Sequence, residues 1–160
     1  MNKFKIAMVQ HSVNSDNKDL NTELAINYIC EAKKNKADLV LFPECFITSY
    51  KFPEIYEKLL PVKEIENIKE FRIWNENALC DDDIHLKKIQ ETALKYNIGV
   101  CITSFTKGKK YPKNTAFVID RKGKILLKYS KVHTCDFSLE RYIESGDEFY
   151  VCDFEGIPCS

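Results

Sequence analysis

Two charged residues follow apolar segments, at the positions where α/β proteins place groups that face a ligand. Glu44 comes after the apolar run 38–42 and a proline, and Lys131 ends the segment 125–131. A carboxylate at such a strand end can take a proton from a nucleophile, and an ammonium can stabilise a developing oxyanion. Taken singly, Glu44 could equally be a helix cap or an exposed turn acid, and Lys131 a solvated edge residue.

The elements that would position Glu44 begin with a strand, a helix and a second strand. Residues 4–9 are typical of a buried strand, and the apolar spacing of Leu20, Leu24, Ile29 and Ala32 predicts a helix. The run 38–42 predicts the second strand, which Pro43 stops. A strand, a helix and a strand within about forty residues favour parallel pairing of the two strands.

The elements that would position Lys131 come later. The three aspartates 81–83 offer N-caps for a helix to about Asn97, with Ile84, Ile89, Ala93 and Leu94 facing inward. Three strands are predicted after this helix, at 98–103, 111–120 and 125–131. These three are consecutive and hairpin-like, so the sheet is expected to be mixed. Residues 50–80, including 54–58 and 62–77, show mixed helical spacing, and we expect specificity to depend partly on them.

An ordered set of short motifs resembles the nitrilase superfamily of carbon–nitrogen hydrolases. The set runs from Ile6–Gln10 through Phe42-Pro43-Glu44, Asn114-Thr115 and Tyr129–His133 to Gly146-Asp147 and Phe149, and so covers nearly the whole chain. Each piece is short, but their order and spacing together are specific. The resemblance implies an α/β fold, the nitrilase-like four-layer α-β-β-α sandwich with a mixed sheet. Residues 1–160 would be one partial domain, about the first half, lacking the C-terminal half.

The resemblance also implies site residues. Glu44 would be the general base of a Glu-Lys-Cys triad, and Lys131 would stabilise the anionic tetrahedral intermediate. Many members have a second glutamate after the lysine. Glu140 matches it best and Glu144 is the weaker candidate, although either acid could be a surface loop charge. The family histidine in the segment that holds His133 is not part of the triad.

The nucleophile of the family lies in a Cys-x-Asp motif at the end of the next strand, which the resemblance places beyond Ser160. Cys159 fits the beginning of that strand, and Cys152 lies within an alternating strand. Cys45 adjoins Glu44 on a segment expected to be extended, where neighbouring side chains point to opposite faces. Cys135, four residues after Lys131, is the least implausible substitute. We therefore expect the sequence to be a truncated or partial one that is inactive by itself.

For the intact protein, the resemblance implies hydrolysis of a small-molecule amide, an N-carbamoyl amine or, less favourably, a nitrile, through a thioester. Common self-association in the family implies a homo-oligomer. A non-catalytic, nitrilase-like binding or scaffold protein is the alternative. A further alternative is an unrelated α/β module, in which Glu44 and Lys131 would lie far apart or face solvent.

The composition of the chain narrows the remaining possibilities for its partners, location and cofactors. Lys plus Arg and Asp plus Glu number 24 each, so no excess of positive charge favours nucleic acid or an anionic membrane. No apolar run approaches the roughly 20 residues of a membrane helix, and the N-terminus lacks the pattern of a signal peptide. We therefore expect a cytoplasmic protein, whose seven scattered cysteines are reduced. No metal-ligand spacing and no glycine-rich phosphate loop are present, so we expect no metal and no cofactor.

Overall fold

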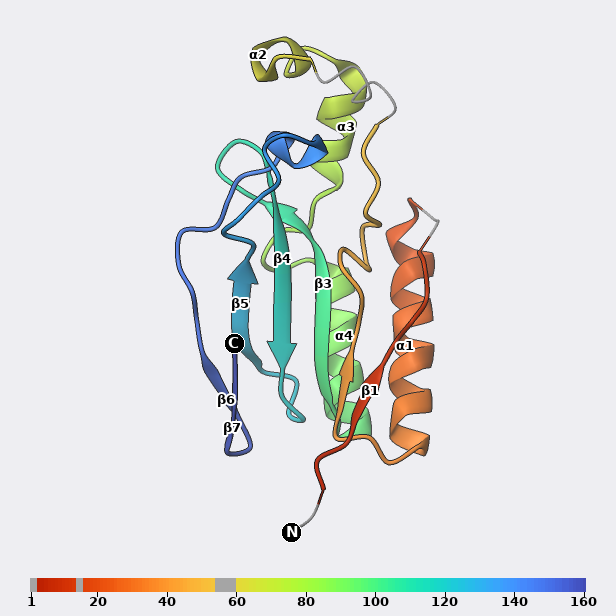
Figure 1. Cartoon of the computed structure of the whole chain (residues 1–160). Helices are drawn as coiled ribbons and strands as arrows, with labels where there is room; N and C mark the ends of the chain where they lie inside the picture. Colours follow the sequence, from red (N-terminus) through yellow and green to blue (C-terminus); the bar gives the residue numbers. More distant parts are fainter. Residues whose placement is uncertain (1–2, 14–15, 54–59) are drawn as a thin grey trace.

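One mixed sheet forms the centre of the molecule. The computed structural model describes residues 3–13, 16–53 and 60–160. The sheet has the order β1-β2-β3-β4-β5 (Figure 1). Its strands are β1 (Ile6–Met8), β2 (Leu39–Leu41), β3 (Gly99–Lys107), β4 (Pro112–Ile119) and β5 (Ile125–Ser130). β1, β2 and β3 pair in parallel, whereas β3, β4 and β5 pair antiparallel. The predicted mixed sheet is confirmed.

Two helices cover one face of this sheet, α1 (Lys18–Lys34) and α4 (Ile84–Tyr96). Asn17 caps α1 by accepting from the backbone N–H groups of Asp19 and Leu20, and Asp83 caps α4 by accepting from that of His85. The main core lies between helices and sheet, and its members include Ala25, Ile29, Val40, Ile89, Ala93, Val100, Ile102, Phe117 and Ile119. One face of the sheet is therefore buried against α1 and α4.

The inward faces of both helices differ in part from the sequence prediction. Leu20, Ile84 and Leu94 are exposed. Small polar side chains instead occupy buried positions: Asn21, Thr22 and Thr92. Each is satisfied there, because the two threonine hydroxyls donate to carbonyls of the preceding turn and Asn21 Nδ2 donates to Ile47 O at 2.9 Å. The helices can therefore pack closely without leaving these three side chains unpaired.

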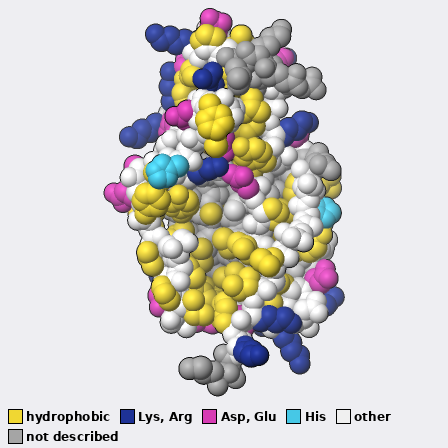
Figure 2. Space-filling view, in the orientation of Figure 1, with side chains coloured by type: hydrophobic (Ala, Val, Ile, Leu, Met, Phe, Trp, Pro, Cys, Tyr) yellow, Lys and Arg dark blue, Asp and Glu magenta, His cyan; other side chains and the backbone are white. Residues whose placement is uncertain are grey.

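The opposite face of the sheet is only partly covered. Val118 and Leu127 pack there with Phe154 of the hairpin formed by β6 (Cys152–Phe154) and β7 (Ile157–Cys159). Ile6 and Met8 remain 52% and 73% exposed, so the prediction of a buried strand at residues 4–9 is wrong for β1 in the described chain. Figure 2 shows hydrophobic side chains gathered over this face. As an edge strand with one open face, β1 has few neighbours to bury its side chains.

A smaller apolar cluster lies beyond the end of β3, with α2 (Val62–Ile65), α3 (Lys69–Asn77) and the 3₁₀ helix η2 (Leu139–Tyr142). Phe71, Phe105 and Tyr142 pack together in it, and the Tyr142 hydroxyl donates to Leu60 O at 2.8 Å. This cluster holds η2 against the sheet. The helical spacing expected at 54–58 lies outside the described residues. In the ranges given above, no helix combines the length and apolar character needed to cross a membrane.

β3 is longer than predicted. The sequence favoured a strand ending at Thr103, but the ladder with β4 continues to the pair Lys107 and Pro112. Ser and Thr residues in this extension lack the apolar character on which the prediction relied. They are buried and hydrogen-bonded, because Ser104 donates to the Thr48 hydroxyl at 3.2 Å and the Thr106 hydroxyl lies 2.7 Å from that of Thr115 on β4.

Candidate active site

A tight turn after β2 positions Glu44. The backbone N–H of Phe42 still bonds Cys101 O at 3.0 Å, as in a strand, and the chain then turns at Pro43. Thr103 of β3 holds this turn, since its hydroxyl donates to Pro43 O and accepts from the backbone N–H of Phe46. Glu44 therefore stands at the carboxyl end of a parallel strand, as the sequence predicted.

The same turn corrects one sequence expectation. Cys45 has φ of 52°, a left-handed conformation, so residues 44 and 45 do not continue an extended chain. The Cys45 side chain is completely buried, and burial raises the pKa of its thiol. The argument from alternating strand faces therefore does not apply, and Cys45 is held in the protein interior by the turn itself.

Lys131 lies directly after β5, and its side chain reaches the carboxylates of both glutamates predicted for the site. Its Nζ donates to Glu140 Oε1 at 2.7 Å and to Glu44 Oε1 at 3.3 Å. Glu44 and Lys131 are 87 positions apart in the sequence. The convergence that the family resemblance required is observed, and the alternative of two distant surface charges is wrong.

Glu140 is the buried acid of this cluster, with 1% of its surface exposed. Its carboxylate accepts from Lys131, from the Tyr50 hydroxyl at 2.9 Å and from the backbone N–H of Cys135 at 2.8 Å. Burial alone would raise the pKa of Glu140, but these donors outweigh it and lower the pKa below its usual value. Glu140 is therefore ionised at neutral pH and fixed in place.

Glu144, the weaker candidate, has a different role. Its carboxylate accepts from the backbone N–H groups of three consecutive residues, Lys109, Lys110 and Tyr111. These contacts fasten the β3–β4 connection. Between the two acids that the sequence offered, geometry places only Glu140 beside Lys131.

The charges of the cluster keep Lys131 protonated. Partial burial opposes its charge, but the hydrogen bond to Glu140 and the nearby charge of Glu44 raise its pKa above the usual value. A fixed cation thus stands between two carboxylates. Glu44 is the more accessible of these, because its side chain is 49% exposed. The arrangement can stabilise a developing anion with Lys131 and move a proton through Glu44.

The sequence did not identify two further residues in this cluster. The Asn114 side chain donates to Glu44 Oε1, and the Tyr50 hydroxyl donates to Glu140. Asn114 belonged to a recognised motif, but no role was assigned to it. The available signal was a polar residue close before the apolar segment 116–119 of a predicted strand. No sequence signal pointed to Tyr50, because it lies 90 positions from Glu140.

The Glu140–Lys131 pair predicts an acid-dependent loss of stability. Because the pKa of Glu140 is lower in the folded protein than in the unfolded chain, its contribution is complete above about pH 4.5. It disappears as the pH falls through the lowered value. Urea unfolding at pH 6, 5, 4 and 3 should show that the free energy of unfolding falls with pH. This fall should be smaller in Glu140→Gln than in the unaltered chain. Glu91→Gln on the exposed face of α4 controls for lost charge, and equal curves for both variants would contradict the prediction.

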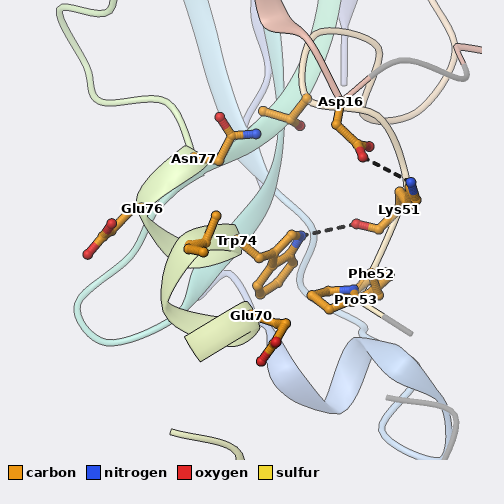
Figure 3. Close-up of a pocket in the computed structure, with 10 residues that line it drawn as sticks. Asp16, Lys51, Phe52, Pro53, Glu70, Trp74, Glu76 and Asn77 are labelled. Carbon is orange, nitrogen blue, oxygen red and sulfur yellow. Dashed lines mark hydrogen bonds and ion pairs between the residues drawn. The ribbon is translucent and has the colours of Figure 1, made fainter. Parts of the chain in front are cut away.

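A groove of about 870 Å³ lies elsewhere, along α3 (Figure 3). Its lining includes Phe52, Pro53 and Trp74, with Asp16, Glu70 and Glu76 around them. Trp74 Nε1 donates to Lys51 O at 3.1 Å, and Lys51 pairs with Asp16 at 2.9 Å. Glu44, Lys131 and Glu140 are not among the residues that line it. This groove therefore does not coincide with the charged cluster.

Within the part of the chain that the structure describes, no three His, Cys, Asp or Glu side chains gather closely enough to hold a metal ion. His85 Nδ1 instead lies 2.6 Å from Asp83 Oδ1, and His11 Nδ1 lies 3.0 Å from the Tyr28 hydroxyl. The exposed His133 ring packs beside Phe149, with centroids 5.9 Å apart. Each of the three histidine rings therefore contacts a neighbouring side chain.

The chain is an α/β protein whose mixed sheet carries Glu44 and Lys131 at its strand ends, with Glu140 of η2 beside Lys131, and comparison with known proteins gives its family. The family model for carbon-nitrogen hydrolases matches residues 5–157, so the chain belongs to the carbon–nitrogen hydrolase family. The chain is similar to "Nitrilase homolog 2" of Dictyostelium discoideum, at 32% identity over 94% of this chain and 43% of that protein. It is also similar to the omega-amidase NIT2 of Pongo abelii, at 30% identity over 97% and 52%.

A solved structure confirms the fold. The amidase from Nesterenkonia sp. AN1, a nitrilase-superfamily protein, has a TM-score of 0.72 to this chain at 19% sequence identity. The match covers 98% of this chain and 55% of the amidase. That amidase was also seen with acrylamide added at its active-site cysteine. The chain spans about half the length of the curated omega-amidases it matches.

Proposed function

We propose that the protein containing this chain hydrolyses small linear amides, ω-amides above all, through a Glu-Lys-Cys triad that includes Glu44 and Lys131. The observation that carries the proposal is the position of Lys131 Nζ, between Glu44 at 3.3 Å and Glu140 at 2.7 Å. Similarity to omega-amidases favours amide substrates, and N-carbamoyl amines are the second substrate class. Similarity to an aliphatic nitrilase, at 25% identity, keeps nitriles third.

Each residue has a defined part in this mechanism. Glu44 takes the proton of the nucleophilic thiol as sulfur bonds to the amide carbon. The Lys131 ammonium stabilises the oxyanion that forms on the former carbonyl oxygen. Glu44 returns the proton to the departing nitrogen as the C–N bond breaks, which leaves a thioester. Glu44 then takes a proton from water as water attacks the thioester, and it passes this proton to the sulfur as the C–S bond breaks, which releases the acid and restores the thiol.

In this proposal the nucleophile is a cysteine that follows Ser160, and the 160-residue polypeptide alone does not catalyse the reaction. Cys45 is the cysteine nearest to Glu44 in sequence, but its thiol is buried and donates to Asn114 Oδ1. Burial also raises its pKa, the opposite of what a nucleophile needs. Cys135 contributes its backbone N–H to Glu140, which is a structural contact.

Sequencing the coding DNA past the codon for Ser160 comes first. An open frame with Cys-x-Asp after an apolar run would provide the protein to assay for released ammonia, with ω-amides, N-carbamoyl amines and nitriles as substrates. Glu44→Gln should lower kcat by about 10²–10⁴-fold, because the general base is lost. Glu31→Gln on α1 removes the same charge far from the site and should leave the rate unchanged. A stop codon directly after Ser160, or no ammonia from any class, would favour a binding or scaffold role instead.

A further inference from the structure

The Asn114 side chain links the interior of the protein to the carboxylate of Glu44. It is 6% exposed and lies in β4, between β3 and β5. Its Nδ2 donates to Glu44 Oε1, and its Oδ1 accepts from Cys45 Sγ at 3.5 Å. Its backbone carbonyl accepts from the backbone N–H of Lys131 at 2.8 Å. One buried residue therefore contacts the two triad members that lie in this chain, Glu44 and Lys131.

The partners of Asn114 determine which way its amide faces. A carboxylate can only accept hydrogen bonds, so the NH₂ end of the amide must face Glu44. The carbonyl end then faces the Cys45 thiol, which stays protonated in its buried position and can donate. Reversing the amide would place its carbonyl oxygen against the Glu44 carboxylate, which is repulsive. The turn at Cys45 and the strand β4 thus fix a single orientation.

In this orientation one carboxylate oxygen of Glu44, Oε1, accepts hydrogen bonds, and the other oxygen, Oε2, does not accept one from the residues that the structure describes. Both Asn114 Nδ2 and Lys131 Nζ donate to Oε1. In the described ranges of the chain, no hydrogen bond or ion pair reaches Oε2. The two donors hold the carboxylate through Oε1, so Oε2 is the oxygen that is open to accept a proton.

We propose that Asn114 is a positioning residue, which holds Glu44 through Oε1 so that Oε2 is the atom that takes the proton. This proposal deepens the proposed function and rests on it for its catalytic meaning. A purely structural Asn114 would stabilise β4 without holding the Glu44 carboxylate. The hydrogen bond from the Asn114 amide to Glu44 therefore separates positioning from stability, and its ¹⁵N–¹H resonances can be measured in the chain itself without any activity.

The test uses Glu44→Gln, which keeps the shape of the side chain but replaces the charged acceptor with a neutral amide. In ¹⁵N–¹H NMR of the chain, the side-chain amide resonances of Asn114 should be displaced relative to the unaltered chain, because the hydrogen bond to a carboxylate is lost. Glu31→Gln is the matched control. It removes the same charge from an exposed position of α1 and should leave these resonances unchanged.

Resonances that are displaced in Glu44→Gln but not in Glu31→Gln support the proposal, and resonances that stay in place in both variants overturn it. Should Glu44→Gln fail to fold, the kinetics of Asn114→Asp in the intact protein replace it as the test.

The intact protein provides the catalytic readout. Asn114→Asp should lower kcat by about 10-fold or more with little change in KM, because the donor that holds Glu44 is lost. Thr115→Val is the matched control and should leave kcat unchanged, since the Thr115 hydroxyl bonds those of Thr106 and Ser130 and not Glu44. An unaltered protein without activity, together with displaced Asn114 resonances in Glu44→Gln, would refute the proposed function and leave the positioning of Glu44 by Asn114 established. Activity with Asn114 resonances that do not respond to Glu44→Gln would refute only the positioning.

Discussion

Replacing Lys131 with methionine is expected to remove amide hydrolysis from the intact protein and to weaken the fold of this chain. The rate should fall by about 10²–10³-fold, which is the usual cost of losing one donor to the oxyanion. The loss should appear mainly in kcat, because the oxyanion exists only after the nucleophile has attacked. Ammonia release under saturating substrate measures it.

The same variant leaves Glu140 buried without its cation. Breaking a buried ion pair costs about 3–5 kcal/mol, but Lys131 is one-third exposed, so solvent screening reduces the expected loss to about 1–2 kcal/mol. Lys128→Met is the matched control. Lys128 lies on the same strand and pairs with the exposed Asp81, so its loss should cost under about 0.5 kcal/mol. Equal urea midpoints for the two variants would contradict the structural importance assigned to Lys131.

Replacing Gly146 with alanine is expected to destabilise the chain by about 2–3 kcal/mol, since added atoms in a packed contact force the backbone apart. A Cβ at this position would lie 2.1 Å from Ser130 O, and backbone cannot move aside as a flexible side chain can. The segment is also held there, because the backbone N–H of Gly146 donates to Lys131 O at 2.8 Å. Urea unfolding measures the loss.

Gly156→Ala controls for the removal of a glycine. A Cβ there meets no atom within 4 Å, but the residue has φ of +84°, so only the backbone strain of roughly 1 kcal/mol is expected. The clash at Gly146 should also displace Ser130 and with it Lys131. The activity of Gly146→Ala in the intact protein should therefore fall, whereas that of Gly156→Ala should not. Similar effects of both variants would show that the contact at Gly146 relaxes easily.

The order of the secondary structure could be predicted because it depends on local patterns. Apolar runs, a stopping proline and aspartate caps identified β2, α4 and the antiparallel strands from neighbouring residues alone. The exposure of Leu20 and Leu94 could not be predicted in this way. Whether a helical residue faces inward depends on the surface against which the helix packs, and that surface comes from elsewhere in the chain.

Tertiary structure also decided which of the two glutamates after Lys131 belongs to the site. Glu140 and Glu144 are four positions apart and chemically identical. The apolar packing of Tyr142 holds η2 so that Glu140 meets Lys131, whereas Glu144 meets the backbone of the β3–β4 connection. Spacing to a family motif favoured Glu140, but only the packed structure distinguishes the two environments.

The sequence by itself determined the family, the strand ends on which Glu44 and Lys131 stand, and the mixed character of the sheet. Those features follow from residue order, which is local. Only the tertiary structure brought Asn114 to Glu44 and Tyr50 to Glu140, across 70 and 90 positions. It also buried Cys45 and Glu140, and burial with specific donors decides whether such groups are charged. These contacts depend on which strands pair and on what covers them, and no local pattern carries that information.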